Sequence, residues 1–115
     1  MRYSKLHEQG TKPPVNTLDS EAWHNLPPAS KQGAVFTVRN KNEKPFSITV
    51  KGHAEQVARA LMERPMKSAS RCRISQYVAA LRSMGLEIDT EGFRTGSRES
   101  YGVYMMRSQL SEVQP

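Results

Sequence analysis

The sequence predicts an α+β fold, in which three helices and a closing β-hairpin form one unit and an additional β-hairpin precedes them. Apolar residues recur at helical spacing between residues 53 and 84, and they alternate with polar residues on both sides of that stretch. Prolines and glycines separate these segments. The chain has 115 residues, of which 37% are hydrophobic, so it has room for one small domain with extensions.

The first third of the chain predicts a tail and a hairpin. Residues 1–33 are polar and interrupted by prolines, which indicates a flexible N-terminal tail. Trp23 is the one tryptophan, and we expect it to dock on the domain or on a partner. Residues 34–51 alternate apolar and polar positions around a polar turn, which predicts a β-hairpin. The turn carries Lys41 and Lys44, which either touch a DNA backbone or are simply solvated.

Two helices are expected next. Residues 53–64 carry an apolar stripe at helical spacing, and Pro65 ends the helix. Ser68 is a suitable N-cap for a short second helix over residues 68–72. We expect Cys72 to be a buried structural residue, because no histidine lies near it in the sequence to activate a catalytic thiol.

The third helix is predicted over residues 75–84, with Ser75 as its N-cap and Gly85 just past its C-terminus. A helical projection places its apolar residues on one side. The face opposite this apolar side has neither Glu nor Lys, although a solvated helix face usually carries both. It is therefore suited to close contact with the floor of a groove. The members of this face are Ser75, Gln76, Ala79, Ala80 and Ser83, with Arg82 at the edge.

A second hairpin and a tail complete the chain. Residues 86–90 and 101–106 read as two strands, because apolar and polar residues alternate in the first and aromatic and β-branched residues mark the second. The connecting loop contains Arg94 and Arg98 beside two glycines, which suits a basic wing at residues 91–100 against a phosphate backbone or a minor groove. Residues 108–115 read as a polar C-terminal tail.

The net charge of +6 favours a polyanionic partner, and its distribution is more informative than its size. Residues 56–86 carry +5, residues 1–55 carry +3 and residues 87–115 carry −2. The positive charge therefore falls on the helical region, where contacts to phosphates would be needed.

Several classes of function are disfavoured. A single cysteine allows no disulfide within the chain, and the sequence has neither a signal-peptide core nor an apolar run of about 18 residues, so we expect a cytoplasmic protein without a membrane partner. His7, His24 and His53 do not have the spacing of metal ligands. No enzyme activity, cofactor or metal is predicted.

Residues 53–106 resemble the small winged helix-turn-helix domains of phage and bacterial proteins, which bind DNA. The resemblance rests on residues 60–66, 72–75, 78–88 and 101–104, in which Ile74-Ser75, Leu81-Arg82, Gly85 and Ile88 mark the turn, the recognition helix, its cap and the first wing strand. It implies a domain at 52–107 that reads double-stranded DNA with the helix at 75–84.

The resemblance also implies which side chains contact DNA. Gln76 would bond adenine and the Ala79 methyl would meet a thymine methyl. Arg82 would contact a phosphate or else pair with Glu87 inside the domain. The implied DNA-binding residues are Lys67, Arg71, Arg73, Ser75, Gln76, Ala79, Arg82, Arg94 and Arg98.

Two functions follow as expectations. The first is sequence-preferring duplex DNA binding by a small transcriptional regulator or a phage DNA-binding factor, as a homodimer if the 34–51 hairpin or the Trp23 segment pairs two copies. The second is a phage-encoded, anti-CRISPR-like inhibitor that binds a protein of a host nucleic-acid machine, because fold alone does not decide function. Its contact residues would be Trp23, Phe36 and Tyr101.

Overall fold

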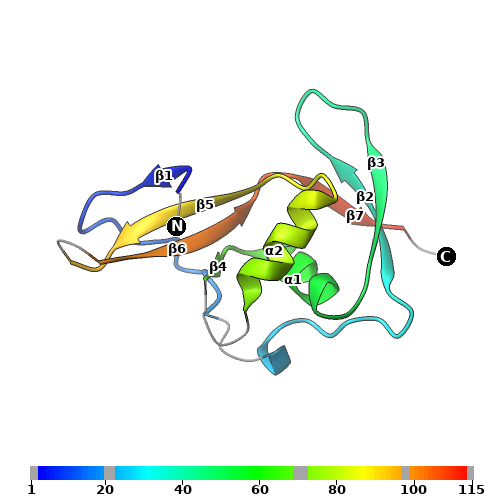
Figure 1. Ribbon diagram of the computed structural model, residues 1–115, viewed down its shortest axis with the longest axis horizontal. Coiled ribbons are helices and arrows are strands. Elements are labelled where there is room, and N and C mark those ends of the chain that lie inside the picture. The colour runs from blue at the N-terminus through cyan, green and yellow to red at the C-terminus, as the bar shows by residue number, and fades with distance from the viewer. Residues whose placement is uncertain (1–2, 20–22, 69–72, 97–98, 114–115) are drawn as a thin grey trace.

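The computed structural model describes residues 3–19, 23–68, 73–96 and 99–113. Within these residues the chain forms two α-helices, one 3₁₀ turn and seven strands in two sheets (Figure 1). The elements are, in order, β1 (Lys5–Leu6), η1 (Trp23–Asn25), β2 (Ala34–Arg39), β3 (Phe46–Val50), α1 (Gly52–Glu63), β4 (Met66–Lys67), α2 (Ile74–Ser83), β5 (Ile88–Arg94), β6 (Ser100–Met106) and β7 (Gln109–Glu112).

The prediction of a three-helix winged helix-turn-helix is wrong. Where the second helix was expected to begin, Met66 and Lys67 form strand β4 and pair with β6. The backbone N–H of Ser68, the expected helix cap, donates to the carbonyl of Gly102 at 2.9 Å. A capping preference is a weak local signal, and an available strand edge overrides it here. Residues 69–72 lie outside the described part of the chain.

The larger sheet has the strand order β1-β5-β6-β4. Its β5–β6 hairpin pairs continuously from Ile88 opposite Met106 to Arg94 opposite Ser100, so half of the predicted wing loop is strand. Gly92 pairs with Leu6 of β1, and a Cβ atom on it would be 2.5 Å from the Tyr3 ring and 2.8 Å from the Leu6 side chain. This close approach requires glycine and lets β1 add to the sheet in parallel with β5.

Both predicted tails take part in the fold. In the segment 1–33, β1 pairs with β5, Leu18 bridges to Met66, and Leu26 is buried. At the other end β7 pairs with β2 along four residues. These short polar segments have little intrinsic preference for a strand, and neighbouring strands supply the pairing that orders them.

The hairpin expected at residues 34–51 is present as β2 and β3, and β7 extends it to the three-stranded sheet β3-β2-β7. The inner face of this sheet joins the helices in one core, because alternate strand residues point the same way. The fully or almost fully buried side chains of this core include Phe36, Val38, Val50, Val57, Ile74, Val78 and Leu81.

Helix α2 ends in a Schellman motif. Gly85, at φ +103°, donates to the carbonyl of Arg82 at 3.0 Å, and Leu86 donates to the carbonyl of Leu81 at 3.2 Å. A Cβ atom on Gly85 would be 2.8 Å from the Phe46 ring of β3. The end of α2 is thereby held against the β2–β3 hairpin. No helix in the described residues is long and apolar enough to cross a membrane.

Candidate nucleic-acid interface

The outer face of α2 is the surface that the sequence predicted would meet DNA. Ser75, Gln76 and Ala79 are exposed on it, while the opposite side of the helix is buried in the core. α2 has no acidic side chain, and it lies across the middle of the molecule with α1 behind it (Figure 1). We call Ser75, Gln76, Ala79 and Ser83 the outer face of α2.

Arg73 stands immediately before this helix. Its backbone is left-handed, with φ 49°, and its side chain is exposed. Ser75 was expected to cap the helix, but α2 begins one residue earlier, at Ile74, and no side chain caps it. The first backbone N–H groups of a helix carry partial positive charge. An exposed guanidinium beside them makes the N-terminal end of α2 attractive to an anion.

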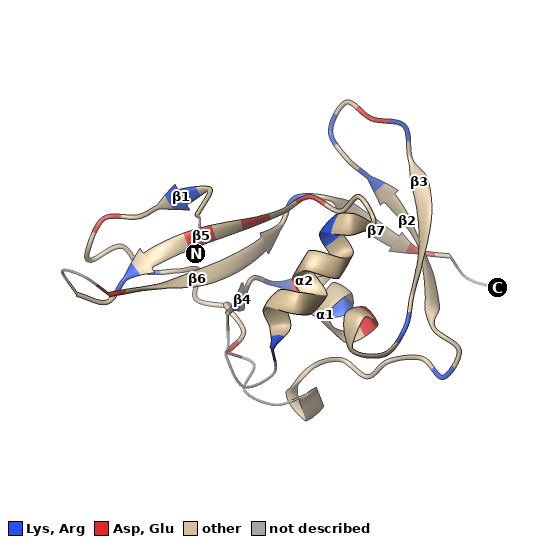
Figure 2. Cartoon of the chain, in the orientation of Figure 1, with Lys and Arg blue, Asp and Glu red and all other residues tan. Residues whose placement is uncertain are grey.

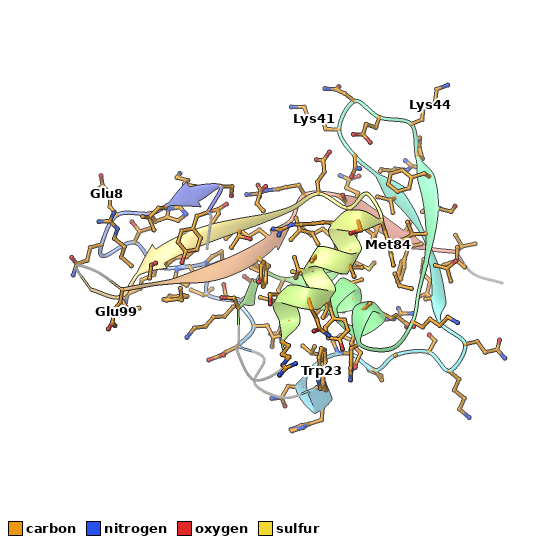
Figure 3. All side chains as sticks on the ribbon, in the orientation of Figure 1. Glu8, Trp23, Lys41, Lys44, Met84 and Glu99 are labelled. Atoms are coloured by element: carbon orange, nitrogen blue, oxygen red, sulfur yellow. The ribbon has the colours of Figure 1, made fainter. Side chains whose placement is uncertain are left out.

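Lysines lie beyond the other end of α2. Lys41 and Lys44 occupy the β2–β3 turn, and Figure 3 shows both side chains pointing away from the body of the protein. The side chain of Asn40, at the base of this turn, donates to the carbonyl of Gly85 at 2.9 Å. This bond ties the turn to the C-terminal end of α2, so that cationic side chains lie beyond both ends of the helix.

Arg82 serves the fold. Its guanidinium donates to the carbonyl of Ile88 from two nitrogens, at 3.0 and 2.7 Å, and to the Thr90 hydroxyl at 2.9 Å. The guanidinium therefore bonds β5 and not Glu87, while the phosphate contact stays a prediction. The side chain connects α2 to β5, and we remove it from the candidate interface.

The remaining basic residues of the prediction lie elsewhere or cannot be placed. Lys67, on β4, holds its ammonium 4.7 Å from the centre of the Tyr101 ring. Arg94 is exposed at the end of β5, and Figure 1 shows this hairpin extending away from α2. Arg71 and Arg98 lie outside the described residues.

Internal ion pairs leave the described surface basic. Arg59 bonds Glu55 and Glu112, both at 2.8 Å, and Arg107 bonds Asp89 at 2.8 Å and Glu91 at 2.6 Å. The hydrogen bond from Arg59 lowers the pKa of Glu112, and the hydrogen bond to Asp89 raises the pKa of Arg107.

These two arginines and their four carboxylate partners together carry a charge of −2. The other described residues carry twelve basic and six acidic side chains, whose distribution is visible in Figure 2.

The aromatic residues considered for protein binding are mostly engaged within the chain. Phe36 has no exposed surface. Trp23 stacks on His53 with ring centres 3.8 Å apart and meets the edge of Tyr77 at 5.2 Å, so it docks on its own domain (Figure 3). Tyr101 is half-buried. An exposed aromatic anchor for a partner protein is therefore not found among these three residues.

The network around Glu55 was not predicted from the sequence. This carboxylate is fully buried and accepts hydrogen bonds from Arg59 and from the backbone and hydroxyl of Ser30. The i,i+4 spacing of Glu55 and Arg59 on a helix was the available signal. Burial of Glu55 was unpredictable, because it depends on the distant Ser30 segment.

The described residues contain no group of three or more His, Cys, Asp or Glu side chains that could hold a metal ion. No protein-family model matches the chain. Neither the curated proteins nor the solved structures searched contain a significant match to it.

Proposed function

We propose that the protein binds double-stranded DNA through the outer face of α2, with Arg73 on phosphates at one end of the helix and Lys41 and Lys44 on phosphates at the other. One observation carries the proposal. The outer face of α2 has small and polar side chains and no acidic group, and cationic side chains lie beyond both helix ends.

The dimensions and chemistry of α2 suit a major groove. Ten helical residues span about 15 Å, and a major groove about 12 Å wide admits an α-helix. Small side chains let the helix backbone approach the base edges. Gln76 has an amide that can bond adenine through two hydrogen bonds, and the Ala79 methyl can contact a thymine methyl. Cationic side chains at both ends would bond phosphates and fix the position of the helix.

A protein partner is supported less well by the same surface. Protein interfaces usually centre on aromatic, Met or Arg anchors in a desolvated core. The outer face of α2 has no aromatic side chain. Phe36 and Trp23 make their contacts inside the chain. A surplus of cations around a small polar helix face fits a phosphate backbone better than an average protein surface.

Replacement of Arg73 tests the phosphate contacts. We expect Arg73→Gln to lower the affinity for a random-sequence duplex about fivefold at moderate salt and to reduce the slope of log Kd against log salt by about 1, because one phosphate contact is lost. Fluorescence anisotropy across a salt series measures both quantities. Lys31→Gln removes the same charge from an exposed turn and should leave the slope unchanged. Equal slopes for the two variants would contradict the proposed role of Arg73.

A further inference from the structure

A hollow of about 530 Å³ lies between residues 12–19 and the strands β4 and β6. Main-chain bonds hold its outer wall in place. Leu18 donates to the carbonyl of Pro65, and Lys67 donates to the carbonyl of Leu18, both at 2.8 Å. This wall belongs to the segment expected to be a flexible tail, and its anchoring beside β4 makes the hollow part of the fold. The outer face of α2 does not line it.

Two lysines give the hollow an attraction for an anion. The ammonium of Lys67 lies 4.7 Å from the centre of the Tyr101 ring, a cation–π distance that holds the charge at the wall. Neither Lys67 nor Lys12, which also lines the hollow, forms an ion pair with a described carboxylate. A phosphate group entering here would lie in a hollow whose lining includes two ammonium side chains.

The rest of the lining suits a ring that carries an amino group. Pro13, Pro14 and the Tyr101 ring supply flat apolar surface. Asp19 supplies a carboxylate, which is the acceptor that pairs with the exocyclic amino group of a base such as cytosine. The volume of about 530 Å³ falls within the range of small-molecule sites, about 300–1,000 Å³. A nucleotide such as that of cytosine presents both groups, a phosphate and an amino-bearing aromatic base.

We propose that this hollow binds one unpaired nucleotide of a DNA strand, with its phosphate at Lys12 and Lys67 and its base between the prolines and Tyr101. The inference rests on the proposed binding of duplex DNA by α2. Lys67 and Arg73 are six residues apart, so their Cα atoms lie within about 20 Å of each other. A strand that leaves a duplex end bound near Arg73 reaches the hollow within a few nucleotides. The protein thus recognises a junction between duplex and single-stranded DNA.

The test compares a blunt duplex with the same duplex carrying an overhang of three cytosine nucleotides, at either the 5′ or the 3′ end. Because the base would stack on an aromatic side chain, we expect the better overhang to bind about tenfold more tightly. An overhang of the same length made of abasic sites keeps the phosphates and should lose most of this gain. Fluorescence anisotropy at fixed salt gives all of these affinities.

Two variants connect the gain to the hollow. Lys67→Met keeps the aliphatic stem and should remove the advantage of the overhang while the blunt duplex binds as before. Asp19→Asn should remove a preference for cytosine over thymine in the overhang. Equal binding of blunt and overhang duplexes, an equal gain from abasic sites, or a gain that survives Lys67→Met would overturn the inference and leave α2 binding intact. Failure of every duplex to bind would instead overturn the proposed function.

Discussion

Arg59→Ala is expected to cost about 3–5 kcal/mol of the free energy of unfolding at pH 7, because it leaves the buried carboxylate of Glu55 without its cation. One Glu55 oxygen accepts from Arg59 Nε at 2.8 Å and from the backbone N–H and hydroxyl of Ser30 at 2.9 and 3.0 Å. The other oxygen is buried and has no hydrogen-bond partner. Arg59 also packs its guanidinium over the Phe36 ring, 5.3 Å from its centre.

The effect of Arg59→Ala depends on pH in a definite direction. Burial by itself raises the pKa of Glu55, but the hydrogen bonds from Arg59 and Ser30 outweigh it and hold the pKa below the ordinary value of 4.5. A carboxyl with a lowered pKa stabilises the fold above about pH 4.5, and this stabilisation is lost as the pH falls through the lowered pKa. In the Arg59→Ala variant we expect burial to dominate and to raise the pKa of Glu55. Acid then protonates this carboxylate and removes the cost of burying an unpaired charge.

Urea unfolding at pH 7 and at about pH 3.5 measures this difference. We expect the difference in the free energy of unfolding between the wild-type protein and Arg59→Ala to be much smaller at the lower pH. Glu112→Gln is the matched control, because it removes the charge of the half-buried second partner of Arg59 and keeps the bond between Arg59 and Glu55, so its loss of stability should be far smaller. An Arg59→Ala protein as stable as wild type at pH 7, or a deficit that does not change with pH, would contradict the role assigned to Glu55.

Ala79→Glu is expected to weaken duplex binding by at least roughly 30-fold, because it places a carboxylate in the middle of the outer face of α2, where DNA phosphates and acceptor atoms would approach. Ala79 is exposed, and glutamate is a good helix former, so the fold should be unaffected. Circular dichroism and thermal unfolding check the fold, and fluorescence anisotropy gives the Kd.

Thr49→Glu provides the matched control for Ala79→Glu. Thr49 is exposed on β3, in the sheet β3-β2-β7, and its replacement makes the same change in net charge. It should weaken binding only a few fold, through the general field of the protein. A similar loss in both variants would show that net charge, and not the face of α2, governs binding.

Much of the fold followed from periodic patterns, and the failures have physical causes. Helices α1 and α2 were expected within one residue of their observed bounds, because each carries its own apolar pattern. The β5–β6 hairpin was expected, but its first strand was predicted at residues 86–90 and lies at Ile88–Arg94. Strands β1, β4 and β7 have two to four residues and exist through pairing with β5, β6 and β2. A pattern of two residues cannot predict a partner strand that lies far away in the sequence.

The exposed face of α2 was predictable from the sequence, and the bonds of the side chain at its edge were not. Helical projection identified Ser75, Gln76 and Ala79 as exposed, because the helix itself determines which residues share a face. It also placed Arg82 at the edge of that face, and only the position of β5 shows that the guanidinium is bound to Ile88 and Thr90. The hollow beside Lys67 was not foreseen, because the 12–19 segment closes it.

The central claim is that α2 meets the DNA duplex, and a titration of ¹⁵N-labelled protein with a short blunt duplex, followed by amide NMR, tests it most directly. The claim predicts that the largest shifts fall on residues 73–83 and in the 40–45 turn, while Ser47 and Thr49, exposed on β3, stay unchanged. Shifts confined to the sheet β3-β2-β7, or no shifts at low salt and a duplex concentration of about 100 μM, would contradict it.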